Sequence, residues 1–302
     1  MTTPIEPPVP PAKPAPLRPG RKLGPIADGV GSVHRAWLEP LRCTYLNSGL
    51  TLSYLSARVP LAKSKLSELL RGTGLYPRWE IILSLSTQLQ MPSWPLYQLW
   101  RQAALEAQKS NDWIERSSEK ASVTTSQTPP LDHRAFRETV EDDYRLYAQV
   151  FLDDDQRDTA IANTFDILWL RWNEALASPD TRRFAWNTLR TTVMARTPHI
   201  DGRPRPEFGA AAFDTVALRT LTADTERMYQ LAESLQLFKA MSRLPDQQLD
   251  VMVLRQLYRI CPEGVSTLLG VPIATIRSSE RHAAHFLESV ICPPPETEGN
   301  TA

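Results

Sequence analysis

Apolar residues recur at intervals of three and four positions along most of this chain, and this helical spacing is its most restrictive feature. The alternation of apolar and polar residues that would indicate a half-buried strand is nearly absent. The chain has 302 residues, of which 42% are hydrophobic, so it is long enough to build two or three helical cores. The sequence therefore predicts an all-α fold, in which an N-terminal domain of five helices is followed by two further helical domains.

Proline-rich and polar segments mark the ends of these domains. Residues 1–31 are dense in proline, which fixes an extended backbone and removes hydrogen-bond donors, so we expect a disordered arm. The polar segments 117–130 and 197–230 are predicted linkers, and the proline-rich, acidic tail 292–302 is also predicted to be disordered. The three helical domains then cover residues 32–116, 131–196 and 231–291.

Charge and cysteine usage narrow the classes of protein to consider. The net charge is zero, so any surface that binds nucleic acid must be local. Cys43, Cys261 and Cys292 form no disulfide or zinc spacing, which suits a reducing compartment. Neither a signal peptide nor an apolar run of roughly 20 residues is present. We expect a soluble cytoplasmic protein, associated with the nucleoid and without a membrane partner.

The sequence gives little support to an enzyme. It contains no glycine-rich phosphate loop, no nucleophile elbow and no paired histidine–carboxylate motif. The remaining candidates are Asp153–Asp155 and the pair His282 and His285. Three consecutive aspartates do not readily converge on one ion, and a zinc site needs four convergent ligands. We interpret the first as a polar turn and the second as a helix face, and expect no enzymatic activity, cofactor or metal.

Residues 50–72 have the pattern of a helix-turn-helix unit. Thr51 is the predicted N-cap of a short first helix, which Pro60 ends. A second helix begins near Lys63 and buries leucines on its inner side. Between residues 33 and 80, seven Lys or Arg residues stand against three Glu residues, a local charge of +4. The predicted contacts are Lys63, Ser64, Lys65 and Ser67 with bases, and Arg71 and Arg78 with phosphates.

Residues 265–287 repeat this pattern near the other end of the chain. Val265 and Leu268 form the buried side of a short helix, and Gly270 supplies a turn that other residues resist. A longer helix follows Pro272. The predicted contacts in this second unit are Thr275, Ser278 and Arg281 with bases, and Arg277 with the backbone. An ordinary polar helix face is the alternative interpretation of these four residues.

The first unit resembles the XRE-type, lambda-repressor-like helix-turn-helix family over residues 50–100. SKLSELLRG and YPRWE, at residues 64–72 and 76–80, carry the resemblance in a form common in actinobacterial regulators. It implies a five-helix DNA-binding domain whose reading helix is Lys63–Arg71.

The rest of the chain resembles sigma factors of the extracytoplasmic-function class. TFDILWLRW and RFAWNTLRTTVMAR, at residues 164–172 and 183–196, are similar to their second region, which grips the polymerase clamp and opens promoter DNA. LPDQQLDVMVLRQLY and LGVPIATIRSSERHAAHFL, at residues 244–258 and 269–287, are similar to their fourth region, which reads the upstream promoter element. The clamp-contacting segment falls on residues 158–163, where Asp158 is the only charged side chain.

Two functions follow as hypotheses. The first is a sigma-factor-like transcription regulator that reads promoter double-stranded DNA through both helix-turn-helix units. It either recruits the RNA polymerase core as an atypical sigma factor, or its altered clamp segment has weakened that recruitment and the sigma-like half serves as a second docking module. The second is an interaction scaffold in transcription control that does not itself bind DNA. The sequence leaves open whether the protein forms a homodimer. It contains no heptad repeat or exposed apolar seam that would indicate one.

Overall fold

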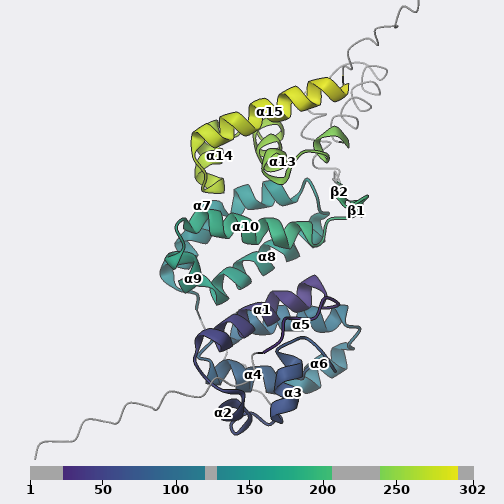
Figure 1. The fold of residues 1–302 in the computed structure, drawn as a ribbon, viewed down its shortest axis with the longest axis vertical. Coiled ribbons are helices and arrows are strands. Elements are labelled where there is room, and N and C mark those ends of the chain that lie inside the picture. The colour runs from purple at the N-terminus through teal and green to yellow at the C-terminus, as the bar shows by residue number, and fades with distance from the viewer. Residues whose placement is uncertain (1–22, 120–127, 206–238, 292–302) are drawn as a thin grey trace, which may run out of the picture.

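The all-α prediction is confirmed. The computed structural model describes residues 23–119, 128–205 and 239–291, and Figure 1 shows their helices stacked along the long axis of the molecule. The described part contains a single antiparallel pair of two-residue strands, β1 (His199–Ile200) and β2 (Arg203–Pro204). This hairpin lies at the start of the predicted linker 197–230. Residues 206–230 of that linker, the predicted tail and residues 1–22 of the predicted arm are outside the described residues.

The first unit consists of six helices, one more than expected. They are α1 (Ser32–Asn47), α2 (Leu52–Ser56), α3 (Lys63–Leu69), α4 (Trp79–Gln88), α5 (Ser93–Glu106) and α6 (Asn111–Ser118). The additional helix, α6, has a local cause: the Ser110 hydroxyl accepts a hydrogen bond from the Trp113 amide at 3.2 Å and caps its N-terminus. Ile114 then anchors α6 in the core of the unit.

Large aromatic side chains fill the centre of this unit. Trp37, Trp79 and Trp100 are fully buried, so these rings pack in the core and are not available for stacking on a ligand. Tyr76 lies among them: it accepts a hydrogen bond from Trp37 and donates one to the Trp100 carbonyl at 2.7 Å. Trp94, which the helical spacing also places in the core, is instead 36% exposed.

Residues 23–31 correct the predicted disordered arm. Ile26 and Val30 pack against the core of the first unit, and the Ala27 amide donates to the Arg71 carbonyl at 2.9 Å. Arg42 of α1 donates to the carbonyls of Gly24 and Leu70, at 2.6 and 2.8 Å. A buried apolar side and specific hydrogen bonds therefore order this part of the arm, which composition alone does not reveal.

Residues 131–196 and 239–291, the two segments for which the sequence suggests a resemblance to sigma factors, share one hydrophobic core. The first contributes α7 (Leu131–Ala148), α8 (Asp154–Leu170), α9 (Trp172–Ala177) and α10 (Thr181–Met194). The second contributes α13 (Asp246–Met252), a π-helical turn (Val253–Leu257), α14 (Pro262–Leu269) and α15 (Ile273–Ile291). Buried side chains from both belong to a single cluster. We call these two segments together the C-terminal body.

A buried carboxylate joins the two segments of this body. Asp250 of α13, which is 3% exposed, accepts hydrogen bonds from Tyr147 at 2.6 Å and from the Trp186 indole at 3.0 Å. Arg190 of α10 donates to both of its oxygens at 3.1 Å and pairs with Asp246 at 2.8 Å. Because a buried charge is stable only when it is paired and hydrogen-bonded, this network fixes α13 on α7 and α10.

Helix α8 carries the contact between the C-terminal body and the first unit. It packs on α5 and α1, and Figure 1 shows it directly above them. Ile167 and Leu170 reach the core of the first unit, and Asn163 donates to the Gln102 side chain of α5.

Candidate nucleic-acid interfaces

Residues 50–72 contain two short helices joined by a turn, α2 and α3, at the positions that the sequence predicts. Thr51 caps α2, because its hydroxyl accepts a hydrogen bond from the Tyr54 amide at 3.1 Å. Leu55 and Val59 are buried, whereas Leu52 is half-buried at the edge of the core. In α3 the inner side chains Leu66 and Leu69 are buried, as expected. The apolar spacing thus fixes which face of α3 points outward.

The side chains predicted to contact DNA in this unit lie on its surface. Lys63, Ser64 and Lys65 are exposed at the start of α3, and Ser67 is half-buried. Arg71 and Arg78, assigned to phosphates, are also exposed. One charge is shared within the helix, because the Lys65 ammonium pairs with Glu68 at 2.7 Å. An exposed pair of this kind is weak and can exchange for a phosphate contact.

The second unit is also present, with the predicted turn. Gly270 ends α14 in the left-handed conformation, at φ +64°, before α15 begins. In α15, Ile276, Ala283 and Leu287 are buried, whereas Ile273 is only half-buried.

The predicted contact residues of this second unit differ in exposure. Arg277 and Arg281 are exposed, and Thr275 and Ser278 are half-buried. Arg277 lies 3.5 Å from Glu263 of α14, and both side chains are 63% exposed. Arg277 and Arg281, one turn apart, therefore provide the cations of this surface.

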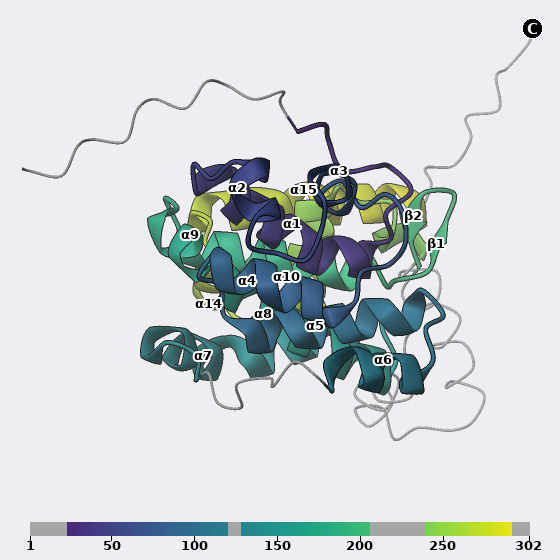
Figure 2. The same cartoon turned by 90° about the horizontal axis from the view of Figure 1, so that it is seen from below.

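The structure does not bring the two predicted surfaces together. Helices α2 and α3 lie at one end of the molecule and α15 at the opposite end, with α8 and α10 between them (Figure 1). Seen along the long axis from below, α2 and α3 are in front and α15 lies behind the rest of the chain (Figure 2). A straight duplex lying on α3 therefore cannot also lie on α15 of the same molecule.

The segment that the sigma-factor resemblance assigns to polymerase contact is partly covered. Ala160 and Ile161 are buried, and Asn163 is buried where it donates to Gln102 of the first unit. Asp158 is exposed, but it pairs with Arg145 at 2.6 Å and with Arg157 at 3.1 Å.

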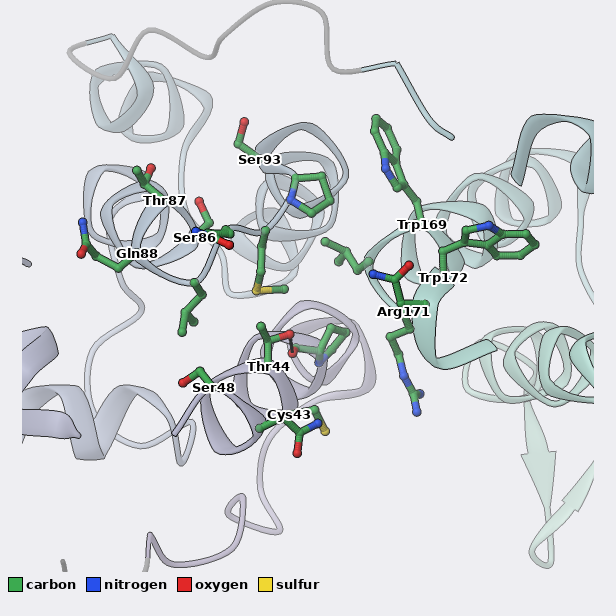
Figure 3. A pocket seen from close by; sticks show the side chains of 18 of the residues that line it. Cys43, Thr44, Ser48, Ser86, Thr87, Gln88, Ser93, Trp169, Arg171 and Trp172 are labelled. Carbon is green, nitrogen blue, oxygen red and sulfur yellow. Dashed lines mark hydrogen bonds between the residues drawn. The ribbon is translucent and has the colours of Figure 1, made fainter. Parts of the chain in front are cut away.

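A large cleft, which the sequence did not indicate, opens between the first unit and the C-terminal body. It measures about 1430 Å³ and lies between the ends of α1, α4 and α5 and the corner that joins α8 to α9 (Figure 3). Among the described residues, its charged lining side chains are Arg171 and Glu174, which pair with each other at 2.7 Å. Burial raises the pKa of the lining thiol Cys43, so this thiol stays protonated near neutral pH. Without a net charge, this cleft does not suit a phosphate backbone.

Within residues 23–119, 128–205 and 239–291, no group of three or more His, Cys, Asp or Glu side chains could hold a metal ion. Asp153 caps α8 by accepting a hydrogen bond from the Gln156 amide at 2.8 Å, so its interpretation as part of a polar turn is correct. None of the helices in the described part is long and apolar enough to cross a membrane.

Comparisons with known proteins add no assignment: no family model, no curated protein and no solved structure matches this chain.

Proposed function

We propose that this protein is a DNA-binding transcription regulator whose first helix-turn-helix unit reads double-stranded DNA. The observation that carries the proposal is the outward face of α3, where Lys63, Ser64 and Lys65 are exposed on a helix whose inner side is anchored by buried leucines. Ammonium and hydroxyl groups on such a face can donate to base edges and to phosphates.

The charge distribution also favours the first unit as the part of the molecule that binds DNA. The local charge of +4 between residues 33 and 80 stands in a chain with no net charge. The first sigma-like segment, residues 131–196, contains more acidic residues than arginines and no lysine. A phosphate backbone is therefore attracted to the first unit rather than to the middle of the molecule.

We propose a secondary role for the C-terminal body. Arg277 and Arg281 of α15 form a second basic surface, which can bind another stretch of DNA but not the same short site as α3. Recruitment of RNA polymerase is weakened, because Asn163 of the segment assigned to that contact is buried against Gln102 of α5. The C-terminal body then acts mainly as a rigid base for the first unit.

The salt dependence of DNA binding tests the role of α3. Duplexes selected by the wild-type protein from a random library are titrated with wild type and with the double variant Lys63→Ala, Lys65→Ala. We expect weaker binding by the variant and a slope of log K against log salt that is less steep by about one unit per lost phosphate contact. The matched control is Arg134→Ala, Lys239→Ala, which removes two exposed charges from the C-terminal body. An unchanged slope in the Lys63, Lys65 variant would show that these lysines do not touch DNA.

The scaffold is the second candidate function. The observation in its favour is the cleft beside α8, whose paired charges offer no attraction to a phosphate backbone but leave room for a protein segment. If the wild-type protein binds no DNA, or binds it with an affinity that hardly changes with salt, the scaffold would be favoured over the regulator.

A further inference from the structure

A second, smaller hollow lies where α1 of the first unit meets α8 and α10 of the C-terminal body. It measures about 380 Å³, within the range of sites for small molecules. Arg35 lines it from α1, Arg171 from the end of α8, and Arg196 from the residues that follow α10. Among the residues that the structure describes, the one carboxylate in the lining is Glu39, which is exposed.

Two of these three guanidinium groups are available to an anion. Arg171 is neutralised by Glu174, to which it donates two hydrogen bonds at 2.7 and 2.8 Å. Arg35 and Arg196, in contrast, have no carboxylate within 4.0 Å among the residues that the structure describes. Both are half-buried, and the described acceptors of Arg196 are neutral: the Thr192 carbonyl at 3.1 Å and Gln102 at 3.4 Å.

Arg196 lies in an environment that is unfavourable for its charge. Burial lowers the pKa of its guanidinium, and the Glu106 carboxylate, which forms no ion pair with it, opposes this effect. A half-buried guanidinium without an ion pair is destabilised, and an anion bound beside it would supply a charge partner.

Part of the lining of the hollow is apolar. Ile167 and Phe184 line it together with Ala36, and Phe184 lies 4.9 Å below the Arg171 guanidinium. Asn187 adds an amide to the same lining. The hollow thus combines two cations with an apolar wall, which suits an organic anion better than a bare inorganic ion.

We propose that this hollow is a binding site for a small aromatic carboxylate. Its carboxylate would accept hydrogen bonds from Arg35 and Arg196, and its ring would lie on Ile167 and Phe184. Because Arg35 belongs to the first unit and Arg196 to the C-terminal body, the ligand would join the two parts of the molecule. The site does not depend on DNA binding and is tested without DNA.

Thermal unfolding of the full chain with matched probes tests this site. Benzoate and phenylacetate carry the expected charge, and benzamide and phenylacetamide have the same shape without it. We expect saturable increases in Tm of at least about 2 °C with the two carboxylates and none with the two amides. Arg196→Gln and Arg35→Gln, each first checked for native helicity, should lose the increase, whereas Arg134→Gln on the exposed side of α7 should keep it.

Three results would overturn the proposal. They are the absence of a shift with either carboxylate, a shift that persists in both hollow variants, and an equal shift with sodium sulfate. The last would indicate a general anion effect rather than a site for an organic carboxylate.

Discussion

Asp250 shows how much of this fold depends on a single side chain. Its carboxylate accepts hydrogen bonds from Tyr147, Trp186 and Arg190, which come from α7 and α10. No motif in the sequence indicates this role, since the partners lie 60 to 103 positions away. The helical spacing of apolar residues indicates that α7 and α10 have a buried face, but not that this face encloses a carboxylate.

We predict that Asp250→Ala destabilises the protein by about 3–5 kcal/mol, because Arg190 would lose its buried partner while Tyr147 and Trp186 lose their acceptor. Denaturant unfolding followed by far-UV circular dichroism measures this change. Asp246 is the other partner of Arg190, and its side chain is 81% exposed. Asp246→Ala should therefore cost less than about 1 kcal/mol. Equal losses in the two variants would contradict a central role for Asp250.

Asp166 provides a prediction for pH dependence. Burial raises the pKa of its carboxyl from 3.8 to about 7, and Arg137 only partly offsets this effect. Between these values the folded chain keeps a proton that the unfolded chain has lost, so this group lowers the free energy of unfolding as pH rises. At pH 8 the Asp166→Asn variant should therefore be more stable than wild type, with little difference below pH 4.

Denaturant unfolding across this pH range measures the effect of Asp166→Asn. Asp142→Asn, at an exposed position of α7, is the control and should show no such pH-dependent gain. A stability difference for Asp166→Asn that does not change between pH 4 and pH 8 would show that the carboxyl does not titrate in this range.

At the scale of elements, apolar spacing and local capping predict the helices well. The stripe Trp37, Leu38 and Leu41 is buried in α1, and Thr51 caps α2 as expected. These features depend on neighbours within a few residues, which the sequence displays directly. The order in residues 23–31 and the hollow beside Arg196 arise from helices distant in sequence, and for that reason periodicity does not reveal them.

Gly270 illustrates an element whose geometry the sequence did predict. Its left-handed turn, at φ +64°, also brings it against the N-terminus of α10, where an added Cβ would collide with the backbone nitrogen of Arg183. Gly202 has a similar φ of +73° but no atom within 4 Å of such a Cβ.

We therefore predict that Gly270→Ala costs more stability than Gly202→Ala. Both variants introduce left-handed strain of about 1–2 kcal/mol, and overpacking at position 270 adds about 1–3 kcal/mol. The midpoints of urea unfolding provide the comparison. If the two variants unfold at the same midpoint, the turn of the second unit is not packed against α10.

On the scale of the whole molecule, the arrangement of the parts decides which hypothesis is favoured. The two helix-turn-helix units lie at opposite ends (Figure 1), and the sigma-like segments form one body around Asp250 rather than two separate modules. The sequence indicates both pairs of helices, but it contains no signal for the side of the molecule on which each pair lies. That placement depends on the packing of α8 on α5. In the proposal that α3 reads DNA, the C-terminal body is then the base on which α3 stands and α15 faces away from the same site.

The most direct test of this account is genome-wide crosslinking of the tagged protein, with polymerase occupancy mapped in the same cells. We predict discrete peaks for wild type that disappear in the Lys63→Ala, Lys65→Ala variant and persist in the Arg134→Ala, Lys239→Ala control, with polymerase occupancy at most of these sites independent of the protein. Peaks that persist in the Lys63, Lys65 variant, or an absence of peaks for wild type, would contradict the proposal that α3 reads DNA.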